Sequence, residues 1–288
     1  MKKFLLITSI AFVLLLGIGG YQYFHFYDGR LHVIFCDVGQ GDAILIISPS
    51  RKHILVDGGP DTSVLDCLGR HLPFWERKIE LMLLTHPHAD HFNGLAFVID
   101  RFVTMSFATE RLINKTGGFS ALLALLEDKK IPQRYVFTSD QWQLGDGVVV
   151  TISGPSEEFL ERTDLDGIID NSAESAALIT EVSYGEVSLL LTGDAPVEEL
   201  LEVARERGSP VEVLQSPHHG SKTGINREVL ELLAPQLSVI SVGKDNTYGH
   251  PTKSVLDLYQ QFEIPVLRTD QVGDVEIVSD GEKWWVNK

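Results

Sequence analysis

The chain has 288 residues, of which 44% are hydrophobic and 22% are charged, a composition typical of a globular protein and not of a disordered or fibrous one. It carries 24 basic and 40 acidic side chains, for a formal net charge of −16. Binding to nucleic acid without regard to its sequence needs a broad basic surface, so this charge excludes such a surface over most of the molecule. A nucleic-acid substrate would need a local cationic site.

The first 30 residues form a separate segment. Two lysines precede an uncharged apolar stretch, Phe4 to Gly20, and an aromatic-rich stretch, Tyr21 to Tyr27, follows it. The length of the apolar stretch lies between that of a signal-peptide core, about 7 to 15 residues, and that of a membrane span, about 17 to 25. Lysines that precede such a segment stay in the cytoplasm. We therefore expect residues 1–30 to be a membrane anchor, or a cleaved signal whose removal would leave a secreted protein, and residues 31–288 to be extracytoplasmic.

From Leu31 onward, β-branched runs alternate with runs of helical periodicity, which is typical of an α/β protein. Strands are predicted at 31–38, 43–48, 53–57, 79–85, 147–153, 176–185, 186–193, 211–216, 237–243, 265–269 and 275–279. Helices are predicted at 64–72, 91–102, 119–130, 195–207, 226–233 and 254–262.

These elements form two mixed halves, which suggests two sheets packed together with helices outside. No short-period repeat or low-complexity linker divides residues 31–288, so we expect one domain. The acidic run 157–174 is predicted to be a solvated loop, because its carboxylates lack the spacing of a calcium loop. Cys36 and Cys67 follow no metal or redox spacing, and we expect both to be free and buried.

The stretch LTHPHADHFNG lies between a predicted buried strand and an amphipathic helix, and it holds His86, His88, Asp90 and His91. Three imidazoles and a carboxylate in one loop would repel one another if protonated and would lack partners if buried and neutral. Both groups are good ligands for a divalent metal ion, so we predict a metal site here. Four isolated histidines are expected to be structural: His25, His32, His53 and His71.

Polar residues also follow later apolar strands directly. Asp194 ends SLLLTGD, the pair His218 and His219 follows VEVLQSP, and His250 ends SVISVGKDNTYGH. Several strand ends that each carry one such side chain form a site along the edge of a sheet. We expect two metal half-sites bridged by Asp194. The first would contain His86, His88 and one of the pair His218 and His219, of which His218 is favoured because it follows the strand directly. The second would contain Asp90, His91 and His250.

A carboxylate-bridged pair of divalent ions about 3.5 to 4 Å apart lowers the pKa of a shared water to about 7 and presents hydroxide to an electrophile. Asp90, Asp194 and His250 are therefore the candidate catalytic residues. Several imidazole ligands favour Zn²⁺, with Mn²⁺ as the alternative.

The motifs THPHADH, HILVDGG and LLLTGD resemble those of the metallo-β-lactamase fold family, and the likeness extends from Leu31 to the end of the chain. More narrowly, FCDVGQGDAILI, SPHHGSKTG and VGKDNTYGHP resemble the soluble hydrolase domain of ComEC-type DNA-uptake proteins. The resemblance implies a four-layer αββα sandwich with a dinuclear site between two mixed sheets.

The resemblance also implies roles for other residues. Asp57 would hydrogen-bond a ligand histidine, and Asp37 and Asp42 would order the adjacent loop, although each of the three could instead be a turn carboxylate. Loop residues beside the metal ligands would contact a phosphate group: Ser221, Lys222, Lys244, Asn246 and Tyr248. The two lysines could instead be ordinary exposed side chains.

Two departures from the subgroup matter. Its members often carry aspartate where this chain has His88, and the additional imidazole makes the site more suited to zinc. The uptake proteins also contain a membrane channel and commonly an oligonucleotide-binding domain, which this sequence lacks, so we expect only the hydrolase chemistry to transfer.

The expected function is hydrolysis of a phosphodiester by a metal-bridging hydroxide. The candidate substrates are DNA and smaller phosphodiesters of the cell envelope. One alternative is hydrolysis of a carboxylic ester, lactone or lactam by the same hydroxide. Another, from a different class, is a metal-stabilised binding subunit of an envelope or DNA-uptake machine. Retention of every expected ligand argues against the binding subunit.

Overall fold

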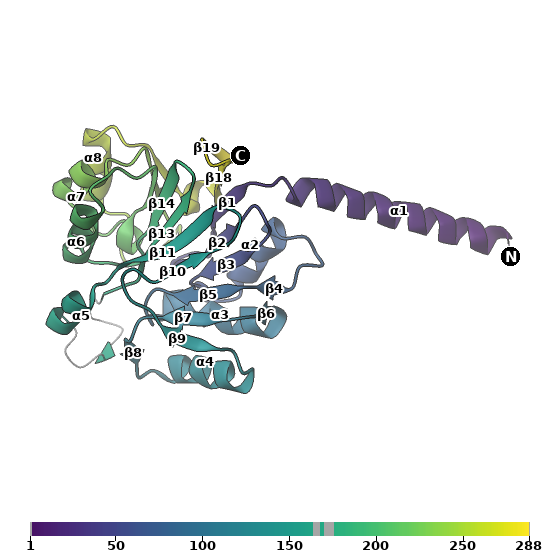
Figure 1. Cartoon of the computed structure of the whole chain (residues 1–288), viewed down its shortest axis with the longest axis horizontal. Helices are drawn as coiled ribbons and strands as arrows, with labels where there is room; N and C mark the ends of the chain where they lie inside the picture. The colour runs from purple at the N-terminus through teal and green to yellow at the C-terminus, as the bar shows by residue number, and fades with distance from the viewer. Residues whose placement is uncertain (1, 164–167, 170–175, 288) are drawn as a thin grey trace.

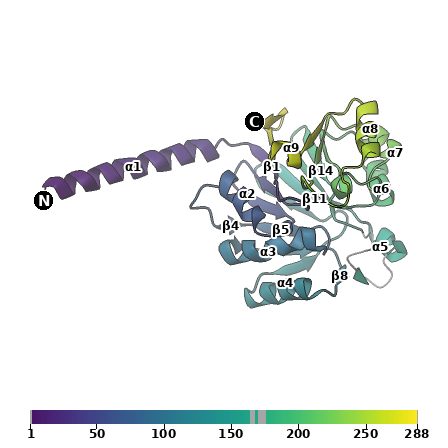
Figure 2. The ribbon, with the colours of Figure 1, turned by 180° about the vertical axis from the view of Figure 1, so that it is seen from behind.

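The computed structural model describes residues 2–163, 168–169 and 176–287. Two sheets pack face to face at its centre, and helices cover their outer faces (Figures 1 and 2). In spatial order, the first sheet contains β19 (Trp284–Asn287), β18 (Val275–Ser279), β1 (Leu31–Phe35), β2 (Ile44–Ile47), β3 (His53–Val56), β5 (Leu81–Leu84), β7 (Phe107–Thr109) and β9 (Gln133–Tyr135). The second contains β10 (Gln141–Gln143), β11 (Val148–Gly154), β13 (Ile179–Tyr184), β14 (Val187–Leu191), β15 (Val213–Gln215), β16 (Leu237–Ile240) and β17 (Val266–Arg268).

The remaining elements surround these sheets. Two small pairs are β4 (Lys78–Ile79) with β6 (Val103–Thr104), and β8 (Ile113–Asn114) with β12 (Ile168–Ile169). Longer helices are α1 (Lys2–Phe26), α2 (Ser63–His71), α3 (Ala89–Arg101), α4 (Gly117–Asp128), α6 (Val197–Arg207), α7 (Arg227–Leu233) and α8 (Lys253–Gln261). Short ones are α5 (Glu157–Thr163), the 3₁₀ turn η1 (Pro217–Gly220) and α9 (Thr269–Val272).

Three apolar clusters hold these layers together. The first joins the facing sides of the two sheets, where Phe35 and Leu189 are both fully buried. The second packs α2, α3 and α4 against the first sheet, and the third packs α6, α7 and α8 against the second. β2, β5 and β14 are buried at every position because both faces of each strand are covered. This arrangement confirms the predicted four-layer αββα sandwich.

The direction of the strands determines where the polar residues that follow them come together. β3, β5, β7 and β9 are parallel in the first sheet, and β14 to β17 are parallel in the second. The loops that follow parallel strands leave from the same edge of a sheet. The sandwich therefore brings the loops after β5, β14 and β15 to one place.

Most predicted strands and helices are present, and the differences are local. The strands predicted at 176–185 and 186–193 form an antiparallel hairpin, β13 with β14. The sequence did not indicate the short strands from β6 to β10, which have too few residues to show a period. The acidic run 157–174 begins as helix α5, contrary to the predicted loop; apart from β12, the rest of it lies outside the described residues. The single-domain assignment stays a prediction.

The prediction of two free cysteines is wrong, because Cys36 and Cys67 form a disulfide. Cys36 directly follows β1 and Cys67 lies on the buried face of α2, and both are fully buried. Their Cα atoms are 5.8 Å apart although 31 positions separate them in sequence. The two cysteines are close because α2 packs on the first sheet, and this packing cannot be predicted from the spacing of the cysteines in the sequence.

Loss of the disulfide should lower the free energy of unfolding. Closing a loop of this length in the unfolded chain is worth about 3 to 4 kcal/mol, so the double variant Cys36→Ala/Cys67→Ala should unfold at a lower urea concentration. Dithiothreitol should destabilise the parent by a similar amount and leave the variant unchanged. Equal urea midpoints for the oxidised and reduced parent would contradict the disulfide.

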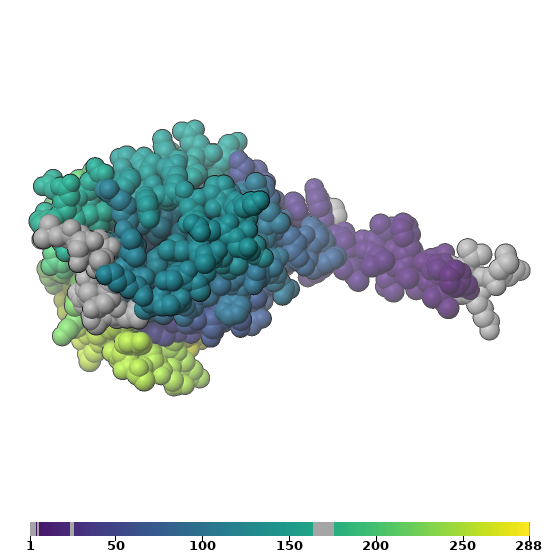
Figure 3. Space-filling model, turned by 90° about the horizontal axis from the view of Figure 1, so that it is seen from below, coloured from purple at the N-terminus to yellow at the C-terminus, as the bar shows by residue number. Residues whose placement is uncertain are grey.

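Helix α1 projects from the globular part and is exposed along most of its length (Figure 3). Its segment Leu6–Tyr23 is long and apolar enough to cross a membrane, and an N-terminal signal sequence meets the same criteria. Its last turn contacts the globular part, where the Arg51 guanidinium donates to the carbonyl of Phe26 and lies over the ring of Tyr27.

Candidate metal centre

The loop between β5 and α3 supplies the first group of candidate ligands. β5 is fully buried and ends at Leu84, and α3 begins at Ala89, so the HPH segment is confined to a short connection. His86 and His91 are fully buried, whereas His88 and Asp90 are partly exposed. The Nε2 atom of His86 lies 2.9 Å from Nδ1 of His88.

Asp194 lies at the centre of the cluster, in the loop that follows β14. Its Oδ2 atom is 3.8 Å from Nε2 of His86 and 3.7 Å from Nε2 of His218. Its Oδ1 atom is 3.5 Å from Nε2 of His91 and 3.7 Å from Nε2 of His219. The two oxygens of one carboxylate thus face two different histidine pairs.

His218 and His219 occupy the 3₁₀ turn after β15, and both have left-handed backbone conformations, with φ of 50° and 54°. Consecutive left-handed residues are rare outside glycine and cost conformational energy, so they indicate a functional constraint. Their rings lie 6.1 Å apart and nearly perpendicular, and they reach opposite oxygens of Asp194. His219 is buried and lies 3.5 Å from Asp90, whereas the side chain of His218 is 29% exposed.

This geometry differs from the division expected from the sequence. The group that includes Asp90 and His91 contains His219, not His250. His218 lies on the side of His86, and the ring of His250 is 5.7 Å from the ring of His218. Spacing assigned only one of the two adjacent histidines to the metals because it could not show the left-handed turn that aims both rings at Asp194.

Hydrogen bonds at the far side of each ring fix its orientation. Nδ1 of His91 donates to Asp57 at 2.8 Å, and Nδ1 of His219 donates to the carbonyl of Ser241 at 2.9 Å. Nδ1 of His86 is 3.1 Å from the hydroxyl of Thr85, which itself donates to Asp57. In the neutral form of each ring, Nε2 is then the nitrogen without a proton and faces the centre, which is the tautomer that binds a metal ion.

Four carboxylates lie in or beside the cluster: Asp42, Asp57, Asp90 and Asp194. Burial alone would lower the pKa of His219, but Asp194 and Asp42 raise it to about 9. Burial would also lower the pKa of His91, and Asp194 and Asp57 raise it well above its usual value. The carboxylates therefore favour positive charge at this place, and a divalent cation would supply that charge in compact form.

The side chains fit divalent metal ions by two further criteria. Ligand atoms about 2.1 Å from a tetrahedral zinc ion lie roughly 3.4 Å from one another, close to the separations around Asp194. Among the described residues, Oδ1 of Asp42 and three atoms that face the centre of the cluster are buried without a well-aligned hydrogen bond, the three being Nε2 of His91, Nε2 of His219 and Oδ1 of Asp194. Buried polar atoms rarely lack partners, and bound metal ions would satisfy all three.

The residues expected to order the neighbouring loops differ in position. Asp57 contacts His91 and Thr85 directly. Asp42 is buried, accepts from Gln215 at 2.8 Å and lies 3.8 Å from His219. Asp37 is exposed and accepts only a turn contact from the amide of Gly39, so the structure puts it in a turn and not beside a ligand.

The residues expected to contact substrate lie in the loops after His219 and after β16. Ser221 is buried and hydrogen-bonds the hydroxyl of Thr223, and Lys222 and Lys244 are exposed. The Asn246 side chain bonds the backbone of Gly243 and of His250, so it orders its own loop. Tyr248 is 69% exposed and its ring is nearly parallel to that of His250, with centroids 6.2 Å apart.

Three residues near the site were missed by sequence reasoning: Thr85, Gln215 and Ser241. Each is a buried polar residue at or just beyond the end of a strand, and each orients His86, Asp42 or His219. Their position after a buried strand was the signal that could have found them.

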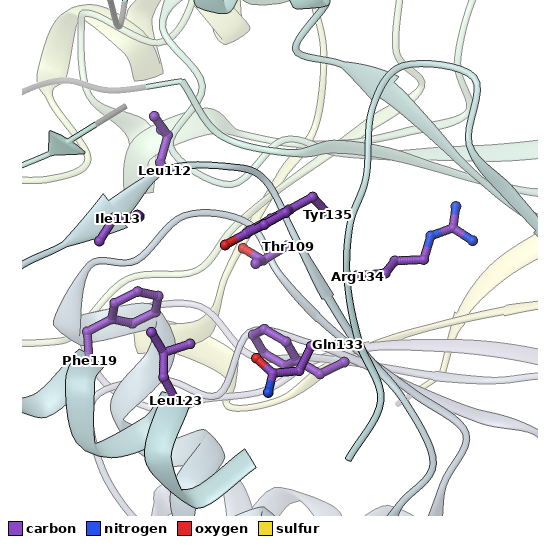
Figure 4. Close-up of a pocket in the computed structure, with 9 residues that line it drawn as sticks. Thr109, Leu112, Ile113, Phe119, Leu123, Gln133, Arg134 and Tyr135 are labelled. Atoms are coloured by element: carbon purple, nitrogen blue, oxygen red, sulfur yellow. The ribbon is translucent and has the colours of Figure 1, made fainter. Parts of the chain in front are cut away.

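A hollow of about 150 Å³ lies between α4 and the outer face of β7 and β9. Phe119 and Leu123 from α4 line one side of it, Leu112 and Ile113 line another, and Tyr135 faces them from β9 (Figure 4). None of the predicted site residues lines this hollow, so it is separate from the metal centre.

The chain is similar to ComE operon protein 3 of Bacillus subtilis (strain 168), with 27% identity over 272 residues that cover 86% of this chain and 33% of that protein. It is also similar to competence protein ComA of Neisseria gonorrhoeae, with 27% identity over 274 residues, or 92% and 35% of the two chains. Exodeoxyribonuclease YycJ of Bacillus anthracis is 23% identical over 154 residues, or 54% and 55%. The chain thus spans about a third of the length of the first two relatives.

Among solved structures, the metallo-beta-lactamase fold protein YhfI of Bacillus subtilis superposes with a TM-score of 0.52, over 82% of this chain and 96% of that one. The two are 12% identical, so this likeness concerns the fold alone. The predicted resemblance to ComEC-type competence proteins and the predicted fold are both confirmed. The model of the metallo-beta-lactamase superfamily matches residues 36–244, and the chain belongs to that superfamily.

Proposed function

We propose that this protein is a hydrolase that cleaves phosphodiesters with two divalent metal ions, most simply Zn²⁺, bound on either side of Asp194. The observation that carries the proposal is the position of the two Asp194 oxygens, which face two separate histidine pairs 3.5 to 3.8 Å away. His86, His88 and His218 would complete one metal site. Asp90, His91 and His219 would complete the other.

When bound, two such ions lower the pKa of a shared water and stabilise negative charge on a phosphate group. The protein's own residues prepare the site for this chemistry. Asp57 and Ser241 hold the rings of His91 and His219 in the ligating tautomer, and burial of both rings excludes bulk water from that side.

His250 and the two loop lysines would contact the substrate. His250 is partly exposed, and its ring lies 5.7 Å from the ring of His218, so the exposed part of the imidazole can bind an oxygen of the phosphate or of the leaving group. Lys222 and Lys244 are exposed in the adjacent loops and supply positive charge that the rest of this acidic protein lacks.

Two observations favour phosphodiesters over carboxylic esters. The loop lysines suit an anionic substrate, and one relative carries the name exodeoxyribonuclease. The net charge of −16 disfavours long stretches of nucleic acid bound across the surface and favours small phosphodiesters or single strands held at the site.

We further propose that α1 anchors the protein in a membrane and that residues 31–288 lie outside the cytoplasm. The buried disulfide supports this placement, because disulfides persist in oxidising compartments. The lysines before the apolar segment support the same orientation.

The full chain in detergent, loaded separately with Zn²⁺ or Mn²⁺, should hydrolyse bis-p-nitrophenyl phosphate. p-Nitrophenyl acetate and single-stranded DNA are assayed in parallel. Turnover of the phosphodiester supports the proposal, and cleavage of DNA identifies a nuclease. Turnover of the acetate alone would assign carboxylic ester hydrolysis instead, and no turnover by the metal-loaded protein would favour a binding subunit.

A further inference from the structure

A second surface combines exposed aromatic side chains with arginines. It consists of the loop 72–77 between α2 and β4, together with the end of α3. Phe74 and Trp75 in this loop are 64% and 39% exposed, and their rings pack edge to face with centroids 4.9 Å apart. Adjacent exposed aromatic rings on a globular protein indicate contact with a partner or a membrane.

A hollow of about 140 Å³ lies beside the aromatic pair, between α2, this loop and the end of α3. Phe74, Arg77 and Arg101 all line it together with one carboxylate, that of Glu76, and both arginines are exposed. Across the pairing of β4 with β6, exposed Lys78 lies opposite exposed Val103. The hollow therefore offers two guanidinium groups next to apolar surface.

The nearby carboxylates leave these two arginines available. Glu76 accepts hydrogen bonds from the backbone amides of Arg77 and Lys78, and Glu80 pairs with Lys78 at 3.1 Å. Within the described ranges, Arg101 forms no ion pair. The Arg77 guanidinium donates one hydrogen bond, to the backbone carbonyl of Glu76. Both arginines are exposed, on a protein whose overall charge is −16.

The surface is joined to the base of α1. The amide of Phe74 lies 3.4 Å from the side-chain oxygen of Gln22, to which it donates. Gln22 stands between Tyr21 and Tyr23, which are 67% and 54% exposed. The loop between α2 and β4 reaches toward α1 in both ribbon views (Figures 1 and 2). Phe74 and Trp75 therefore lie level with the aromatic end of the apolar helix.

We propose that loop 72–77, with Arg77 and Arg101, docks onto the surface of an anionic phospholipid bilayer, the same membrane that α1 enters. Tyrosine and tryptophan side chains concentrate at the boundary between hydrocarbon and headgroups, so Tyr21 and Tyr23 mark that boundary and Gln22 holds the loop at its level. The aromatic pair enters the boundary, and the two guanidinium groups bind lipid phosphates.

Docking of this kind determines which face of the globular part meets the membrane. An anionic bilayer repels the acidic remainder of the protein, while each basic side chain near its surface favours binding roughly fivefold. The proposal rests on the proposed anchoring of α1 in the membrane and does not depend on the catalytic proposal.

Quenching of tryptophan fluorescence by brominated lipids tests the proposal. The full chain is reconstituted into phosphatidylcholine vesicles with and without phosphatidylglycerol, with bromine atoms on the acyl chains near the headgroup. The part of the emission that comes from Trp75 should be quenched in the parent. It should also be quenched in the control variant Trp142→Phe, because Trp142 lies in the second sheet. That part should be absent in Trp75→Phe. Quenching should also be stronger with phosphatidylglycerol.

Charge reversal provides an independent test. Arg101→Glu should weaken docking to the anionic vesicles roughly fivefold or more, whereas Lys253→Glu, at an exposed position in the first turn of α8, should not change it. Circular dichroism and bound metal content establish that each variant is folded. Equal quenching in the parent and in Trp75→Phe would overturn the proposal, as would quenching unaffected by both phosphatidylglycerol and Arg101→Glu.

Discussion

Asp194→Ala should reduce phosphodiester turnover by roughly a thousandfold or more. The two oxygens of Asp194 face His86 with His218 and His91 with His219, so its removal would weaken both metal sites together. The kcat for bis-p-nitrophenyl phosphate and the bound metal content, measured by mass spectrometry, should both fall.

Asp245→Ala is the matched control, because Asp245 is an exposed carboxylate outside the cluster. It should keep both the bound metal and the turnover rate of the parent. If Asp194→Ala retained full turnover, the metal-based hydrolase mechanism would be wrong; if it lost turnover but kept two metal ions, the bridging role of Asp194 would be wrong.

His218→Ala and His219→Ala should each lower the metal content from about two ions to about one, with turnover reduced roughly a hundredfold or more. The reason is that each ring faces a different oxygen of Asp194. The remaining ion should differ between the two variants, because His218 lies on the side of His86 and His219 lies beside Asp90 and His91.

His250→Ala distinguishes this arrangement from the division expected from the sequence. Among the described residues, His250 lies beside His218 and outside the four histidines that face Asp194, so this variant should keep two metal ions while its turnover falls. Loss of one ion in His250→Ala, together with two ions in His219→Ala, would restore the original division.

The sequence predicted part of the fold and part of the set of site residues. Long buried strands such as β5 and β14 carry a clear apolar signal, and polar residues at their ends indicate the site because parallel strands share an edge. The order of strands and helices suggested two packed sheets with helices outside, and the family resemblance implied the four-layer αββα sandwich. Short strands such as β7 and β9 carry too few residues for a period to appear.

Relations between distant residues were not accessible from sequence. The pairing of Cys36 with Cys67 depends on how α2 lies on the first sheet, which no spacing encodes. The position of His219 beside Asp90 and His91, where His250 was expected, depends on two successive left-handed residues. Two adjacent histidines in a sequence do not predict that backbone conformation. Local chemistry could be predicted, whereas the geometry that joins separate loops could not.

The central claim is that two metal ions lie on either side of Asp194. Anomalous diffraction from crystals of the zinc-loaded protein tests it directly. We expect two anomalous peaks about 3.5 to 4 Å apart, one among His86, His88 and His218 and the other among Asp90, His91 and His219. A single peak, or peaks that do not include Asp194 as a shared ligand, would contradict the dinuclear site.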